Sequence, residues 1–216
     1  VPDFPAVAVI RLPHIANFTD FHALSSQSAF ETRFFDEPVH LDRFDTVIIP
    51  GSKNTRADLA WLNEKFGAAL AGYHKNNKFI FGICGGYQML GQHVDDPDGH
   101  EGQPGRTPGL GLLPVHTELK APKTTTLSCF NWGTLTGEGY EIHMGETTVP
   151  AGMELIDVKS RNSQACRGKD GCIRADRTAA GTYIHGFFDT PAILEKWVRL
   201  SGLNIDCSAL DHTRSK

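Results

Sequence analysis

The feature that most constrains this chain is a tight corner between an apolar run and a glycine-rich segment. Residues 79–81 read Phe-Ile-Phe, and residues 82–88 continue as Gly-Ile-Cys-Gly-Gly-Tyr-Gln. A strand that turns directly into a helix needs small residues at the corner, because the backbone angles are unusual and the two elements approach closely. The pattern therefore predicts a buried strand, a corner that holds Cys84, and a helix that begins immediately after it.

The position of Cys84 at this corner makes it the predicted nucleophile. A side chain at such a corner projects into a cleft, and the N–H groups at the start of the following helix favour a thiolate. A thiolate that attacks a carboxamide also needs N–H donors for the oxyanion and a group that manages the proton. The rest of the chain must supply these two functions.

His185 is the candidate acid and base. It follows the segment Thr182–Ile184 and precedes Gly186, so it is expected to project from the carboxyl end of a strand. Ligands of open α/β sheets bind at that edge. A hydrogen-bonded core histidine is an equally good interpretation of His185 taken alone, because the chain contains ten histidines.

The candidate oxyanion donors lie at a second strand end and at the corner itself. Gly51 and Ser52 follow an apolar run that ends at Pro50, and their backbone N–H groups, with that of Gly85, are expected to face the Cys84 sulfur. Gln88 lies one helical turn after Cys84. Its side-chain amide is expected either to contact a bound substrate or to support the neighbouring loop.

Composition bounds the function classes. The chain has 216 residues, of which 40% are hydrophobic, and this length is sufficient for a single domain with a full core. Its 21 basic and 25 acidic residues form no basic stripe, so nucleic acid is not an expected partner. No apolar stretch approaches the roughly 20 residues of a membrane span. We therefore expect a soluble, cytoplasmic protein without membrane contacts.

Cysteine spacing indicates reduced thiols. The five cysteines include no C-x-x-C pair, which argues against a disulfide framework and against a zinc site, and we expect no metal. Cys166 and Cys172 flank a turn-like segment and are the one pair for which a disulfide is conceivable. The cytoplasmic character expected for the rest of the chain argues against that disulfide.

Apolar periodicity predicts an α/β fold in the first half. Residues 7–12, 46–49 and 79–83 are expected to be buried parallel strands. Apolar residues at helical spacing between the last two predict a crossover helix, which makes a right-handed βαβ unit. A helix near 21–29 and a short strand near 31–34 complete this half.

The second half of the chain has a different sequence pattern. Residues 95–109 are rich in Asp, Gly and Pro and predict a surface loop. Short alternating runs between residues 112 and 183 predict mixed or antiparallel strands that extend the sheet. A closing helix is expected at 191–200, with Pro191 in its first turn. The predicted core spans residues 7–203, followed by a polar tail at 204–216.

Several segments, in this order along the chain, resemble the class I glutamine amidotransferase domain of the cobyrinate-amidating group. The first resemblance lies in Pro50–Thr55, Gly82–Gln88 and Gly181–Gly186. Further segments are similar to the cobyric acid synthase family in particular, and these are Arg11–Pro13, Asn17–Phe21, Gly109–Pro114 and Gly139–Gly145. The resemblance covers residues 7 to about 203. It implies a flavodoxin-like α/β fold with a mostly parallel central sheet, helices on both faces and an antiparallel extension.

The resemblance also implies a reaction. Cys84 would attack the side-chain amide of glutamine, and ammonia would leave with a proton from His185. In cobyric acid synthases the ammonia amidates a corrinoid, adenosylcobyrinic acid a,c-diamide, after ATP activates its carboxylates. That step belongs to an N-terminal synthetase domain with a P-loop, where ATP and Mg are expected to bind. The present 216 residues contain no such P-loop, so no cofactor is expected in this chain.

One position departs from the wider class, whose ordinary members carry Glu two residues after the histidine. This chain has Phe187 at that position. It resembles the cobyrinate-type group in this respect, because that group also lacks the glutamate. The residue that orients His185 is therefore open, with Glu141, His143 and Asp189 as candidates. Glu141 and His143 are expected to point to opposite faces of a strand, so at most one of them is expected to reach the site directly. Asp189 is better explained as the N-cap of the closing helix.

Other functions remain as alternatives at this point. Within the same fold they are the glutaminase domain of cobyrinic acid a,c-diamide synthase and that of a complex that amidates a cell-wall lipid precursor, lipid II. Outside this group they are a cysteine peptidase or amidase built on a similar corner, and a non-catalytic binding module. The presence of both Cys84 and His185 counts against the last of these.

Overall fold

A mostly parallel six-stranded sheet forms the centre of the molecule, as predicted. The structure, a computed structural model, describes residues 4–38 and 40–211. The strands of this sheet occur in the order β13-β14-β4-β3-β1-β2, and only the pairing of β13 with β14 is antiparallel. Their bounds are β1 Ala6–Ile10, β2 Glu31–Phe35, β3 Thr46–Ile49, β4 Phe79–Ile83, β13 Cys172–Ile173 and β14 Ala179–Thr182.

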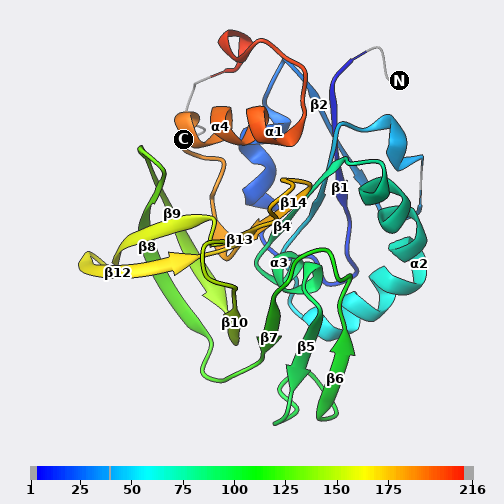
Figure 1. Cartoon of the computed structure of the whole chain (residues 1–216), viewed down its shortest axis with the longest axis vertical. Coiled ribbons are helices and arrows are strands. Elements are labelled where there is room, and N and C mark those ends of the chain that lie inside the picture. The colour runs from blue at the N-terminus through cyan, green and yellow to red at the C-terminus, as the bar shows by residue number, and fades with distance from the viewer. Residues whose placement is uncertain (1–3, 39, 212–216) are drawn as a thin grey trace.

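Helices cover both faces of this sheet. Figure 1 shows α2 (Thr55–Lys75) on one side, and α1 (His22–Ser25) and α4 (Pro191–Ser201) on the other. The apolar stripe predicted for the crossover helix is buried in α2, at Leu59, Leu62, Phe66, Leu70 and Tyr73. The helix expected at 21–29 is shorter than predicted. It consists of a 3₁₀ turn, η1 (Phe18–Phe21), followed by the single turn of α1.

The remaining strands form two further sheets, whereas we expected them to extend the central one. A five-stranded sheet has the order β12-β11-β8-β9-β15, with bounds β8 Thr124–Trp132, β9 Leu135–His143, β11 Ile156–Arg161, β12 Gln164–Asp170 and β15 Ile184–His185. A four-stranded sheet has the order β10-β7-β5-β6, with bounds β5 His93–Asp96, β6 Gly105–Pro108, β7 His116–Glu118 and β10 Glu146–Thr148. The chain leaves the central sheet at Thr182 and enters the five-stranded sheet at Ile184, which brings β15 beside β9.

The prediction of a surface loop at residues 95–109 is wrong in part, because strands occupy both ends of this segment. β5 and β6 pair as an antiparallel hairpin in which Val94 lies opposite Thr107. Asp96 is buried within it and accepts hydrogen bonds from the backbone of His100 and Glu101 and from Arg56. A hairpin tip rich in Asp, Gly and Pro has the same composition as a free loop. Composition therefore did not predict the two strands on either side of the tip.

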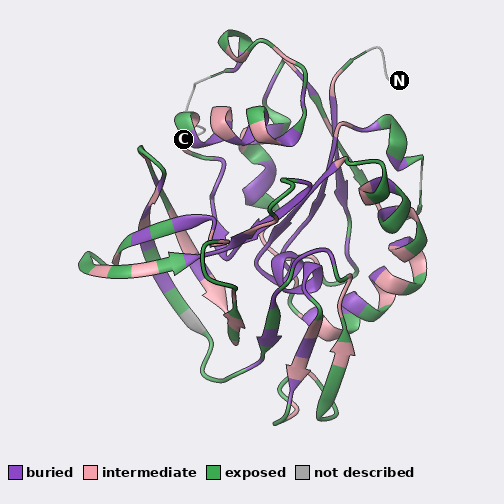
Figure 2. Ribbon diagram, in the orientation of Figure 1, coloured by how far each residue is buried: buried purple, intermediate pink, exposed green. Residues whose placement is uncertain are grey.

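The core follows the central sheet, and the buried residues concentrate on its strands (Figure 2). Part of the segment that we predicted to be a polar tail, residues 204–216, packs against the rest of the protein. Leu210 is buried, and Asp211 bonds to Gln27 and Ser28 near α1. Residues 212–216 of that tail lie outside the described residues.

Candidate active site

The corner at Cys84 has the predicted form. Its backbone has φ 52° and ψ −112°, it directly follows β4, and it precedes α3 (Gly85–Leu90). A Cβ on Gly86 would lie 2.0 Å from the carbonyl oxygen of Ile49, so only glycine permits this approach of α3 to β3. Positive φ is costly for a residue with a side chain, by about 1–3 kcal/mol. The surrounding structure therefore holds Cys84 in a strained position.

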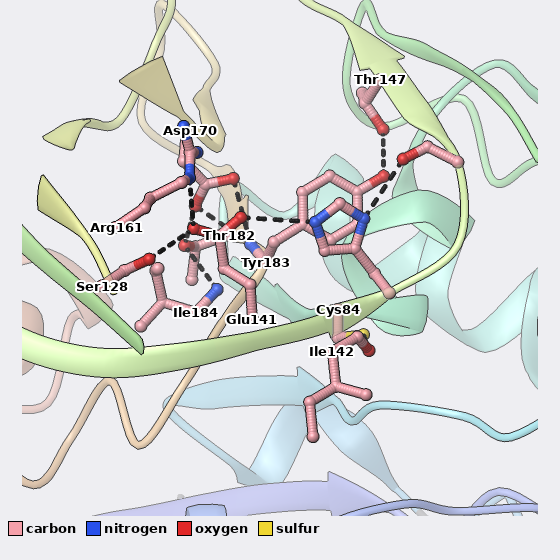
Figure 3. A network of polar contacts seen from close by, with 12 residues as sticks. Cys84, Ser128, Glu141, Ile142, Thr147, Arg161, Asp170, Thr182, Tyr183 and Ile184 are labelled. Atoms are coloured by element: carbon pink, nitrogen blue, oxygen red, sulfur yellow. Dashed lines mark hydrogen bonds and ion pairs between the residues drawn. The ribbon is translucent and has the colours of Figure 1, made fainter. Parts of the chain in front are cut away.

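The sulfur of Cys84 lies beneath the carboxyl end of β9. Its thiol donates a hydrogen bond to the carbonyl oxygen of Ile142 over 3.4 Å. Figure 3 shows this contact at one end of a wider group of polar contacts. The backbone N–H of Cys84 donates to Thr182 at the end of β14, which ties the corner to the next strand of the sheet. Cys84 is 6% exposed.

His185 meets Cys84 above Gly51. A Cβ placed on Gly51 would lie 3.2 Å from Cε1 of His185 and 3.7 Å from Cβ of Cys84. The ring of Tyr140 stacks on the imidazole with centroids 5.2 Å apart. The structure therefore brings the predicted nucleophile and the predicted acid and base together, although they come from two different sheets.

Asp20 is the carboxylate that orients His185. Its Oδ2 lies 2.7 Å from Nδ1 of His185, and its Oδ1 accepts a 2.9 Å hydrogen bond from the backbone N–H of Gly186. Both side chains are 1% exposed. The amide of Asn17, at the start of the same 3₁₀ turn, lies 3.2 Å from each ring nitrogen of His185.

These contacts set the charge of the imidazole. Burial by itself lowers the pKa of His185, but hydrogen bonds to Asp20 and Cys84 and their charges outweigh it and raise the pKa to about 10. The ring is therefore protonated at neutral pH. The imidazolium lies beside the sulfur of Cys84, where it can donate a proton to a leaving group.

The three predicted oxyanion donors surround the corner. A Cβ on Gly85 would lie 3.0 Å from the backbone nitrogen of Ser52, which shows how closely the two backbone segments approach. The hydroxyl of Ser52 donates to Asp58 over 2.6 Å and accepts from the N–H of Asn54 over 2.9 Å. The side chain of Ser52 is thus used to fix its loop. This leaves the backbone of the loop as the part available for an oxyanion.

Gln88 lies where its side chain supports a loop. Its Nε2 donates to the carbonyl of Met144 and to the hydroxyl of Tyr183, each over 3.0 Å, and its Oε1 accepts from Thr55. The side chain is buried, with 2% of the residue exposed. Of the two roles expected for Gln88, these contacts favour support of the segment that follows β9.

None of the three predicted orienting residues is the partner of His185. The expectation that Glu141 and His143 point to opposite faces is wrong, because residues two apart on β9 share one face, where these side chains contact each other over 3.3 Å. His143 also stacks on Tyr183, with ring centroids 3.8 Å apart. Asp189 does not cap α4, whose N-cap is Thr190. Burial raises the pKa of Asp189, which lies beside Gly186 rather than on the imidazole.

Sequence reasoning missed Asp20 and Asn17 as site residues. They lie 165 and 168 residues before His185, so no local spacing connects them to it. The segment Asn17–Phe21 was identified as similar to the family, but no role was assigned to it. One sequence signal for Asp20 exists. It is an acidic residue in a segment that resembles the family, and this segment follows the first strand, whose end lies at the edge of the sheet where ligands bind.

Two negative findings hold for the part of the chain that the structure describes. No group of three or more His, Cys, Asp or Glu residues there is placed to hold a metal ion. No helix among the same residues is long and apolar enough to cross a membrane. All five cysteines, including Cys166 and Cys172, are free.

The fold and site together define a class I glutamine amidotransferase fold with a Cys-His-Asp constellation at the carboxyl edge of its parallel sheet. Two solved structures share this fold at low identity. PurLQS from Thermotoga maritima has a TM-score of 0.64 and 16% identity, covering 87% of this chain and 89% of that one. A protein described as glutamine amidotransferase has a TM-score of 0.64 and 17% identity, covering 91% and 98%.

Sequence comparison then identifies the family. Residues 6–193 match the CobB/CobQ-like glutamine amidotransferase domain, and the chain belongs to that family. It is 46% identical over 191 residues to a cobyric acid synthase of Chlorobium phaeobacteroides (strain BS1), covering 87% of this chain and 39% of the relative. It is 43% identical over 198 residues to a cobyric acid synthase of Salmonella typhimurium, covering 86% and 38%. The chain thus spans about two fifths of these relatives.

Proposed function

We propose that this chain is the glutaminase part of a cobyric acid synthase. The observation that carries the proposal is the meeting of Cys84, His185 and Asp20 at the sheet edge of a CobB/CobQ-like domain. The names of the relatives support the choice of cobyric acid synthase over the other amidating enzymes of this group.

The chemistry follows from the geometry. The Cys84 thiolate attacks the side-chain carbonyl carbon of glutamine, and the carbonyl oxygen becomes an oxyanion that N–H groups of Ser52 and Gly85 receive. The protonated His185 gives its proton to the leaving nitrogen, so that ammonia departs and a γ-glutamyl thioester remains. Water then attacks the thioester, His185 takes up a proton from that water, and glutamate leaves as the sulfur is restored. Asp20 holds the imidazole in position throughout.

The remainder of the reaction is proposed to lie outside this chain. The chain would form one domain with its core at residues 7–203. A synthetase region of the same polypeptide would bind ATP, Mg and the corrinoid, adenosylcobyrinic acid a,c-diamide, and would use the ammonia for amidation. The length of the relatives, about two and a half times the matched part, supports such a region. Five free cysteines support a cytoplasmic location.

Labelling of Cys84 tests this function. The chain is incubated with a glutamine-like alkylating analogue, and the modified residue is identified by mass spectrometry. We expect modification at Cys84, protection by excess glutamine, and no modification in Cys84→Ser. In the full-length protein, Cys84→Ser should abolish amidation driven by glutamine and leave amidation driven by ammonia. Absence of labelling at Cys84 in the chain and in the full-length protein contradicts the proposal.

A further inference from the structure

Two backbone segments meet at the carboxyl edge of the central sheet and carry different parts of the site. Residues 51–53 come after β3 and contain the predicted oxyanion donors Gly51 and Ser52. Residues 14–16 come after β1 and lead into η1, which contains Asp20. The two segments pair as a short antiparallel bridge with two backbone hydrogen bonds, of 2.8 Å and 2.9 Å. A displacement of one segment would therefore move the other.

One buried carboxylate holds both segments. Asp58 lies in the first turn of α2 and is completely buried. Its Oδ2 accepts a 2.6 Å hydrogen bond from the hydroxyl of Ser52. Its Oδ1 lies 2.8 Å from Nδ1 of His14, and each of its oxygens accepts from the backbone N–H of His14 over 3.2 Å. Three donors from the two segments therefore converge on one side chain.

These three donors explain why a carboxylate fits at position 58. A carboxylate accepts hydrogen bonds at both oxygens and donates none, so Asp58 receives all three donors at once. An asparagine amide has one acceptor oxygen, and its NH₂ group would face at least one of the donors. The proton of the Ser52 hydroxyl goes to Asp58, which leaves the hydroxyl oxygen to accept from the N–H of Asn54 over 2.9 Å. The loop is thus fixed from both sides.

We propose that Asp58 is a positioning residue for glutamine hydrolysis, which holds the oxyanion donors in place beside the segment that leads to Asp20. It acts through Ser52 and His14 rather than on the reacting atoms. Oxyanion donors stabilise a transition state when they lie about 2.7–3.1 Å from the developing charge, so a small shift of their loop lowers the rate. The inference rests on the proposed function, because it concerns the rate of that reaction.

Steady-state kinetics of glutamine hydrolysis by the full-length protein test the proposal. We expect Asp58→Asn to lower kcat about ten- to a hundredfold and to change KM less than about threefold, because the oxyanion forms only in the transition state. Asp45→Asn is the matched control. Oδ2 of Asp45 accepts from the N–H of Ala6 over 2.8 Å and so joins the amino ends of β3 and β1, whereas Asp58 joins the segments beyond their carboxyl ends. Asp45→Asn should lower the melting temperature and leave kcat unchanged.

A pair of substitutions at His14 gives a readout that a loss of stability alone would not produce. The side chain of His14 is 52% exposed, so neither substitution should prevent folding. His14→Leu removes the side-chain donor to Asp58, whereas His14→Asn places an amide N–H donor near the position of Nδ1. We expect His14→Leu to lower kcat about three- to tenfold, the usual effect of one hydrogen bond, and His14→Asn to restore most of it.

The outcomes separate this inference from the proposed function. Absence of glutamine hydrolysis in the unsubstituted protein overturns the proposed function, and this inference with it. If the unsubstituted protein is active, an unchanged kcat in Asp58→Asn, or an equal loss in Asp45→Asn, overturns this inference alone. Equal activity of His14→Asn and His14→Leu also overturns it, and this comparison decides the outcome if Asp58→Asn does not fold.

Discussion

At the scale of single residues, the site depends on how one imidazole is held. His185 is almost completely buried, yet its pKa is raised to about 10, because Asp20 and Cys84 stabilise the protonated ring more than burial disfavours it. Asp20 is itself fixed by the N–H of Gly186, the residue that follows the histidine. This carboxylate therefore fixes the direction of the ring nitrogens and, together with Cys84, favours the protonated ring.

Asp20→Asn tests this role. The amide keeps the shape of the side chain but removes the charge, so we expect a roughly 10²- to 10⁴-fold fall in kcat for glutamine hydrolysis, with a smaller change in KM. The pKa of His185, measured by NMR titration, should fall in the same variant. Asp189→Asn is the control, because Asp189 does not contact the imidazole, and it should retain activity. Equal losses in the two variants contradict the assignment of Asp20.

The sequence predicted Cys84, His185 and the glycines of the corner because each is marked by its neighbours along the chain. Asp20 was not predicted, since the contact that gives it a role spans 165 residues and crosses from η1 to β15. Gln88 was predicted with two roles open, and only the positions of Met144 and Tyr183 favour one of them. Local pattern identifies a reactive residue, whereas its partners depend on tertiary structure.

At the scale of elements, the close approach of α3 to β3 is what creates the corner. Gly86 at this crossing differs from glycines elsewhere in helices, because a methyl group on it has no space beside Ile49 and Pro50. The parallel strands and the crossover helix were predicted, since continuous apolar runs and helical spacing are strong patterns. The hairpin β5–β6 and the separation of the remaining strands into two sheets were not predicted, because periodicity shows neither the register of a strand nor the sheet to which it belongs.

Gly86→Ala and Gly72→Ala form a matched pair that tests the corner. A Cβ on Gly86 would overlap the Ile49 carbonyl oxygen at 2.0 Å, whereas a Cβ on Gly72, in α2, meets nothing within 4 Å. We expect Gly86→Ala to lower the free energy of unfolding by several kcal/mol or to prevent folding, as strain in a packed core does. Gly72→Ala should raise it by about 0.5–1 kcal/mol, because alanine favours the helix. Urea denaturation measures both, and similar effects would contradict the role of Gly86.

At the scale of the whole molecule, buried ionisable groups make stability depend on pH. The pKa of His185 in the folded protein is about 10, against its ordinary value of 6.5, so between these two pH values the folded protein holds a proton that the unfolded chain has lost. The stability that this proton contributes is fully present below pH 6.5 and is lost as the pH rises toward 10. The proton on Asp170 contributes to stability with the same sign but at lower pH. Burial raises the pKa of Asp170 from 3.8 to about 6, so this contribution is lost as the pH rises toward 6.

The alkaline part of this dependence is a direct prediction. The free energy of unfolding, from urea titrations between pH 7 and pH 10, should fall with rising pH in the unsubstituted chain. His185→Gln cannot bind the proton, so its slope over the same interval should be smaller. Because lysines and tyrosines titrate equally in both proteins, the difference between the two slopes reports His185 together with the Cys84 sulfur that contacts it. Identical slopes would show that the histidine has no raised pKa.

The distribution of the site along the chain has one more consequence. Its three members stand at positions 20, 84 and 185, on η1, after β4 and on β15, and each is immobilised by a different part of the molecule. A nascent or truncated polypeptide that ends before β15 contains the thiol of Cys84 but not the imidazole of His185. The reaction of Cys84 with an electrophile therefore reports that the site is complete. The time at which this reaction begins during refolding would show when β15 pairs with β9.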